Sequence, residues 1–144
     1  MKIHGRKRYG YALWMIGMAA VVGVSALVRQ IAHPVVVQGQ SMEPTFTDGQ
    51  RLWVTEAYWL FGGLKANDVV LVRSPEDGDV LIKRVYGLPG QEMDWDAPTL
   101  QQVGNRRYVP ANAIFIVGDN PEVSVDSRDF GPVPLNHVIG KVLQ

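Results

Sequence analysis

The sequence contains no cysteine and only three histidines among its 144 residues. The absence of cysteine excludes disulfides, thiolate nucleophiles and cysteine-ligated zinc. Because His4, His33 and His137 are few and far apart in the chain, a histidine-based metal site is not expected either. We therefore expect neither a metal ion nor a cofactor, so that any chemistry has to come from other side chains.

An excess of basic residues is also lacking, because 14 basic and 14 acidic residues leave a formal net charge of zero. Four of the basic residues, Lys2, Arg6, Lys7 and Arg8, lie within the first eight positions. The chain from Arg29 onward therefore carries the other 10 basic residues against all 14 acids. A mildly acidic body has no basic face for nucleic acid, and we expect no nucleic-acid partner.

Charge is absent from residues 9–28, and an apolar helix of this length spans about 30 Å. A cleavable secretory signal would have a shorter apolar region and a small-residue cleavage site, which is not evident before Arg29. We expect a basic cytoplasmic tail over residues 1–8, a transmembrane helix over 9–28 and an extracytoplasmic domain over 29–144. The basic tail sets this orientation by the positive-inside bias.

After residue 34 the sequence changes to short apolar runs that are bounded by Gly, Pro, Asn and Asp, without a helical period. This pattern predicts a mainly β fold, in which the N-terminal helix precedes a single, mostly antiparallel β-sheet body. A hairpin is expected around residues 104–105. Strands are expected at residues 35–38, 51–55, 69–72, 80–86, 113–117 and 138–142.

Residues 57–64 are aromatic and uncharged, and they allow two interpretations. The one that we favour places them in the hydrophobic core. The alternative is an exposed apolar edge that dips into the membrane interface, because the domain would be held close to a bilayer.

Ser41 lies between the apolar run 34–37 and a turn at Pro44. A serine in such a place most often hydrogen-bonds its own backbone as a turn residue. It can act as a nucleophile only if other parts of the chain supply a base and a group that orients the base.

Lys83 lies in the run 80–86, where alternation places Leu81, Lys83 and Val85 on one face of a strand. If that face is the core, burial disfavours the ammonium, lowers the pKa of Lys83 and makes the amine a possible general base. If the opposite face is buried, Lys83 is solvated. Periodicity alone favours the solvated lysine.

Residues 118–131 are dense in short hydroxyl and carboxylate side chains, with Arg128 among them. They suggest a polar network behind a site, in which Asp126 or Asp129 pairs with Arg128 and Ser124 or Ser127 orients a neighbour. A calcium loop is the competing hypothesis, but the spacing does not match an EF-hand. A solvated acidic loop is the simplest interpretation.

Taken together, four segments in this order resemble the type I signal peptidases, in the short form typical of Gram-positive relatives. Residues 41–45 (Ser-Met-Glu-Pro-Thr) resemble the nucleophile motif, and residues 68–70 resemble a Gly-Asp-Val-Val strand in which Asn67 replaces the glycine. Residues 83–90 resemble the lysine motif, with Gln91 where an aspartate is customary. Residues 118–131 match the C-terminal signature of the family.

The resemblance implies catalytic roles for three residues. Ser41 would be the nucleophile, Lys83 the general base, and Ser124 would hydrogen-bond and orient the Lys83 amine. The backbone N–H of Ser41 would form the oxyanion hole. Some relatives add a serine hydroxyl two positions before the nucleophile, and here that position is Gly39.

The resemblance also implies supporting roles and a binding mode. Asp126 and Arg128 would form a structural ion pair, and Met42 would shape the site. The substrate would add as an extended strand between residues 35–38 and 80–83, with small side chains at the first and third positions before the cut.

The function implied is a membrane-bound serine endopeptidase that removes signal peptides from exported preproteins. Its partners would be those signal peptides and membrane lipid, near the export translocon, with a single pass through a bacterial cell membrane and a cytoplasmic N-terminus. One alternative is a non-catalytic, membrane-tethered peptide-binding module that assists pilus or export assembly. Another is a self-cleaving repressor of the Ser/Lys type, but no DNA-binding helices are evident.

Overall fold

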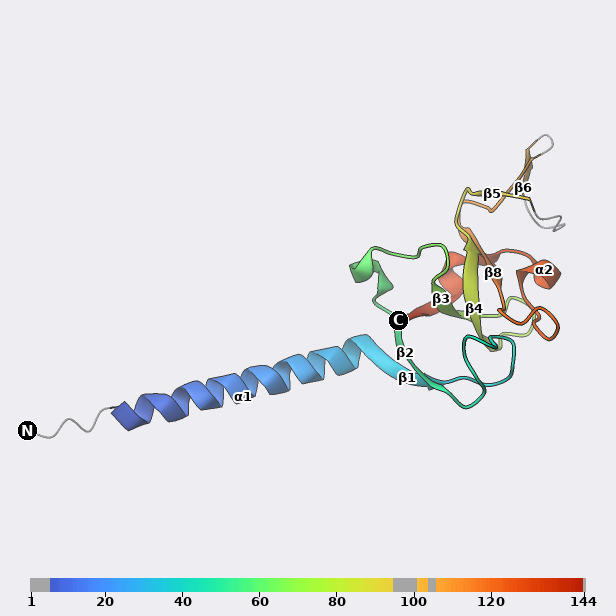
Figure 1. Cartoon of the computed structure of the whole chain (residues 1–144). Helices are drawn as coiled ribbons and strands as arrows, with labels where there is room; N and C mark the ends of the chain where they lie inside the picture. Colours follow the sequence, from blue (N-terminus) through green and yellow to red (C-terminus); the bar gives the residue numbers. More distant parts are fainter. Residues whose placement is uncertain (1–5, 95–100, 104–105, 144) are drawn as a thin grey trace, which may run out of the picture.

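The structure, a computed structural model, describes residues 6–94, 101–103 and 106–143. It begins with helix α1 (Arg6–Ile31), which projects away from a β body (Figure 1). The helix is longer at both ends than the predicted 9–28 and continues directly into strand β1. None of the helices within the described residues combines the length and apolar content that a membrane crossing requires. The helix is therefore observed, and its passage through a membrane is not confirmed.

The body is built on one seven-stranded sheet in which all paired strands are antiparallel. Its strand order is β1-β2-β10-β3-β4-β8-β9, so the C-terminal strand β10 lies between β2 and β3. The strands are β1 (Ala32–Val36), β2 (Arg51–Thr55), β3 (Val69–Arg73), β4 (Val80–Gly87), β8 (Ala113–Val117), β9 (Val133–Pro134) and β10 (Val138–Val142).

A second, three-stranded sheet shows that the prediction of a single sheet is wrong. It consists of β5 (Glu92–Met93), β6 (Gln101–Val103) and β7 (Arg106–Tyr108) in the order β5-β7-β6. Its strands have two or three residues each, too short for period-two alternation to be recognised. The expected hairpin is confirmed by the pairing of β6 with β7, although residues 104–105 lie outside the described residues.

Among the described residues, the body also contains three short helical segments, which the sequence did not predict. They are η1 (Tyr58–Phe61), α2 (Ser127–Phe130) and η2 (Leu135–His137). One turn of helix is too short to show an amphipathic period. The start of α2 is set by local interactions: Asp126 caps the N-terminus, and Asp129 completes a capping box with it.

The favoured interpretation of residues 57–64 as core is wrong for the two side chains that matter most. Trp59 and Leu60 in η1 are 68% and 55% exposed. Gly62 ends η1 in a left-handed conformation with φ of 86°.

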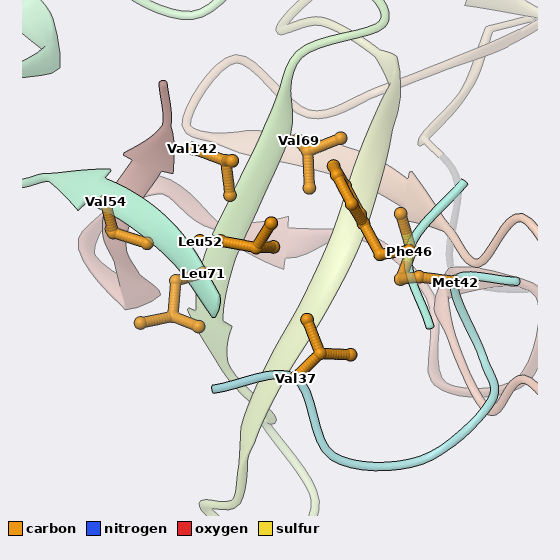
Figure 2. Close-up of a cluster of buried hydrophobic side chains, with 8 residues drawn as sticks. All are labelled: Val37, Met42, Phe46, Leu52, Val54, Val69, Leu71 and Val142. Atoms are coloured by element: carbon orange, nitrogen blue, oxygen red, sulfur yellow. The ribbon is translucent and has the colours of Figure 1, made fainter. Parts of the chain in front are cut away.

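Strand β3 lies in the middle of the core and is buried on both faces, as its continuous apolar run predicted. One face carries Val70 and Val72, which form a cluster with Val85, Ile114, Ile116 and Val133. The other face carries the cluster that Figure 2 shows, in which Met42 and Phe46 of the loop after β1 lie against the sheet. This cluster consists of Val37, Met42, Phe46, Leu52, Val54, Val69, Leu71 and Val142.

Candidate active site

Ser41 is held in a loop whose two ends are hydrogen-bonded to each other. The Val37 N–H donates to the Gln50 carbonyl at 2.8 Å, and the Gly49 N–H donates to the Val37 carbonyl at 2.9 Å. Next to Ser41, the Met42 side chain is 1% exposed and fills the sheet-facing cluster. The serine therefore sits at the surface of a loop that its own neighbour anchors in the core.

The backbone N–H of Ser41 is available at the site, whereas that of Gly39 is not. Gly39 has φ of 87°, and its N–H donates to Asp48 Oδ1 at 2.8 Å, so this donor is already used. In the described part of the chain no acceptor is found for the N–H of Ser41. Since Gly39 has no hydroxyl, the Ser41 N–H is the donor that an oxyanion at this serine would meet.

Lys83 is 2% exposed, so the solvated lysine that periodicity favoured is wrong. Its face of β4 is the buried one, because Val85 beside it is 0% exposed while Tyr86 on the opposite face is 49% exposed. Burial lowers the pKa of Lys83; the Asp126 carboxylate opposes this shift, and the Arg128 guanidinium reinforces it.

Two adjoining hollows meet at Ser41 and Lys83. The first runs between the β1 side and β4 and is lined by residues 35–38, by 80–83 and by Met42 and Leu71. The second extends over the loop and adds Gly39, Gln40, Val123 and Val125 to the four residues that line both hollows, which are Gln38, Ser41, Leu81 and Lys83. The structure thus brings together a surface serine and a buried lysine that are 42 positions apart in sequence.

Asp126 organises the polar segment that follows β8. Its carboxylate is fully buried and accepts hydrogen bonds from the Gly118 N–H at 2.8 Å and from Ser124 Oγ at 2.7 Å. It also forms a two-point ion pair with Arg128, at 2.8 Å from Nε and 2.6 Å from Nη2. Desolvation opposes ionisation, but these hydrogen bonds outweigh it and lower the pKa of Asp126.

The Ser124 hydroxyl is bonded differently from what the resemblance implied. It donates its proton to Asp126, and no hydrogen bond between Ser124 and Lys83 is present among the described residues. Because a hydroxyl has one proton and two lone pairs, this donation leaves the Ser124 oxygen as an acceptor only.

The polar segment and the Ser41 loop are joined at two points. The Asn120 N–H donates to the Ser41 carbonyl at 3.0 Å. Gly118 lies between the two, since a Cβ at this position would come within 2.6 Å of both the Ser41 carbonyl oxygen and the Ser124 Cβ. A residue without a side chain is therefore required where the two segments approach.

Arg84 and Asp119 form an ion pair that sequence reasoning missed. The two side chains bond at 2.8 Å and 2.6 Å, and a further Arg84 nitrogen donates to the Asn67 carbonyl at 2.9 Å. The partners are 35 positions apart, so no spacing rule links them. Asn67, whose carbonyl accepts from Arg84, is the residue that replaces a family glycine. It adopts φ of 70°, a conformation that asparagine tolerates.

A metal site finds no support in the described residues, which contain no group of three or more His, Asp or Glu side chains placed to hold an ion. The segment proposed for calcium uses its carboxylates in other ways. Asp119 pairs with Arg84, and Asp126 pairs with Arg128.

Comparison with known proteins gives consistent matches. The family model "Signal peptidase, peptidase S26" matches residues 8–100 and 91–144. Signal peptidase IB of Staphylococcus aureus (strain COL) is 27% identical, over 90% of this chain and 85% of that protein. Mitochondrial ATP-independent inner membrane protease subunit 1a of Arabidopsis thaliana is 38% identical, over 80% of this chain and 70% of that protein.

A solved structure of a signal peptidase I from Enterococcus faecalis V583 also matches, with 26% identity and a TM-score of 0.46, over 56% of this chain and 97% of that one. The two curated relatives are named as a peptidase and a protease, so the non-catalytic alternative is not favoured. Because the family model covers nearly the whole chain, this protein belongs to the signal peptidase family, peptidase S26, and is a serine peptidase.

Proposed function

We propose that this protein is a membrane-bound endopeptidase that removes signal peptides from exported preproteins, with Ser41 as nucleophile and Lys83 as general base. The observation that carries the proposal is the burial of the Lys83 amine next to the hollows that Ser41 lines. A lysine whose pKa is lowered by burial can be neutral at working pH, and only the neutral amine can accept a proton.

The reaction proceeds in two halves. In the first half, Lys83 takes the proton of the Ser41 hydroxyl as Oγ attacks the scissile carbonyl, and the Ser41 N–H stabilises the oxyanion. The resulting ammonium then gives its proton to the leaving amine, which leaves an acyl-enzyme on Ser41. In the second half, Lys83 deprotonates a water molecule that attacks the ester, and the proton returns to Ser41 Oγ on release.

Ser124, Asp126 and Arg128 hold the base in place. Because Ser124 gives its proton to Asp126, its oxygen is free to accept from the Lys83 amine and to direct the nitrogen lone pair towards Ser41. Asp126 fixes Ser124, and Arg128 fixes Asp126 through the two-point ion pair. Met42 anchors the Ser41 loop through its buried side chain, which packs in the hydrophobic cluster on the sheet.

The substrate binds as an added strand in the first hollow. β1 pairs only with β2 within the described residues, and residues 80–83 of β4 pair only with β3, because pairing with β8 begins at Arg84. Both strands therefore have an unpaired edge facing this hollow. An extended peptide satisfies such edges by backbone hydrogen bonds, which is the usual way that a strand is recognised.

Attachment to a bacterial cell membrane is through α1, with the N-terminus in the cytoplasm and the β body outside. Support comes from the helix itself, which projects away from the body (Figure 1), and from its large apolar side chains, which are exposed. They include Tyr11, Leu13, Trp14, Met15, Ile16, Met18, Val21, Val22 and Val24.

The decisive experiment uses the full chain in detergent with a model preprotein. Ser41→Ala and Lys83→Ala should each abolish cleavage while circular dichroism remains that of the wild type. Lys65→Ala, at an exposed lysine, is the matched control and should cleave normally. Wild-type cleavage by either active-site variant would refute the dyad. Resistance of the protein to alkaline carbonate extraction tests the membrane attachment separately, and release into the supernatant would contradict it.

A further inference from the structure

The second hollow is not used by the mechanism above. It shares Gln38, Ser41, Leu81 and Lys83 with the first hollow and also includes Gly39, Gln40, Val123 and Val125. The first hollow has the strand edges that an extended peptide needs, whereas the residues found only in the second belong to loops. A peptide that follows the first hollow and is cut at Ser41 must continue into the second.

Val123 and Val125 are unusual occupants of an otherwise polar segment. They are 53% and 58% exposed, which is a costly position for β-branched apolar side chains. They alternate with Ser124, which hydrogen-bonds to Asp126, and with Asp126, which is fully buried. Both valine side chains line the second hollow.

The chemistry of this hollow favours an apolar occupant. Apart from Lys83, none of its lining residues carries a charge, and Leu81 adds a further apolar side chain. Burying methyl groups against the two valines removes apolar surface from water on both sides of the contact. The other side chains of the lining, Gln38, Gln40, Ser41 and Lys83, are polar, so the apolar preference comes from the two valines and Leu81.

We propose that Val123 and Val125 form a subsite for the first two residues after the scissile bond, and that this subsite selects apolar side chains. The inference rests on the proposed function and adds a specificity on the leaving-group side of the cut. The valines contact the part of the substrate that departs when the acyl-enzyme forms. They therefore affect acylation and have no role in hydrolysis of the acyl-enzyme.

The test compares two peptides on the full chain in detergent. The peptides are identical up to the cut and differ only in the first two residues after it, which are valine-leucine in one and serine-asparagine in the other. We expect kcat/KM of the wild type to favour the apolar peptide by about tenfold, the low end of what a methylene contributes in an apolar pocket. In Val123→Ser/Val125→Ser this ratio should fall to about one.

Leu143→Ser is the matched control, because Leu143 is an exposed apolar residue outside both hollows and should keep the wild-type ratio. A wild-type ratio near one, or a ratio that survives in the double variant, would overturn the subsite while leaving the peptidase intact. If the wild type cuts neither peptide, the proposed function itself fails and the subsite with it. A ratio is insensitive to the fraction of folded enzyme, so partial unfolding of the variant cannot imitate the expected result.

Discussion

Gly118→Ala should disable the site through a single methyl group. The added Cβ would lie 2.6 Å from the Ser41 carbonyl oxygen and 2.6 Å from the Ser124 Cβ, and closer still to Ser124 Oγ. Ordinary contact between such atoms is about 3.5 Å, so one of the two segments has to move by about 1 Å. Each segment carries one proposed partner of Lys83, the proposed nucleophile Ser41 or the proposed orienting residue Ser124, so movement of either one disturbs the proposed geometry.

The magnitude follows from that displacement. A misplacement of about 1 Å in a catalytic constellation costs roughly 100-fold in rate, which corresponds to about 2.7 kcal/mol of transition-state stabilisation. Overpacking of a tight site costs a further 1 to 3 kcal/mol, roughly, in folding stability. We therefore expect kcat/KM for preprotein cleavage to fall about 100-fold, measured at a temperature where circular dichroism shows the variant to be folded.

Gly140→Ala separates the two effects. A Cβ at Gly140 would also lie 2.6 Å from a neighbour, the Val54 Cγ1, and 2.9 Å from the Thr55 carbonyl oxygen, but none of these atoms lines the hollows at Ser41. This variant should lose a comparable amount of stability and keep kcat/KM near that of the wild type while folded. Wild-type activity in Gly118→Ala, or an equal loss of kcat/KM in both variants, would refute the positioning role of Gly118.

Three further predictions concern the charges at the site. Since only neutral Lys83 can act as base, kcat/KM should rise as the pH increases through the lowered pKa of Lys83. Arg128→Gln should move this rise to higher pH, because the variant lacks a cation that lowers the pKa of Lys83. An unmoved pH profile would contradict this prediction. Lys83→Met should be inactive yet more stable at neutral pH by about 1 kcal/mol in urea unfolding. Between the lowered pKa and about 10.4 the unfolded chain binds more protons at Lys83, so wild-type stability rises with pH there and the gain of the variant should shrink. Asp126→Asn should lower the free energy of unfolding by about 3 kcal/mol, because the ion pair with Arg128 loses its buried partner. The pKa of Asp126 is lowered in the folded protein, so the stability that this group contributes in the wild type should be present above about pH 3.9. It should be lost as the pH falls through the pKa of Asp126 in the folded protein.

The strands could be predicted where local patterning is complete. The bounds of β2, β8 and β10 agree with the sequence-based ranges, because each is an apolar or alternating run between turn residues. The order of the strands could not be predicted. β10 pairs with β2 and β3 across more than 60 residues of chain, and no local signal specifies this insertion.

The buried face of β4 could not be predicted because the strand carries one basic residue on each face. Lys83 and Arg84 alternate, so any register places one of them towards the core. The structure resolves the ambiguity by giving Arg84 a partner in Asp119 and giving Lys83 no ion pair within the described residues. The choice depends on a contact between residues 35 positions apart, which periodicity does not contain.

Asp126 lies close to the proposed base, yet the pKa of Lys83 remains lowered. A buried carboxylate near Lys83 raises the pKa of the amine and favours the ammonium, which cannot accept a proton. Yet the carboxylate is required, because it holds both the Gly118 N–H and the Ser124 hydroxyl. Arg128 acts against this effect, since its guanidinium lowers the pKa of Lys83 while its two-point pairing leaves the hydrogen bonds of Asp126 in place. Arg128 therefore favours the neutral form of the amine, in addition to pairing with the carboxylate that organises the segment.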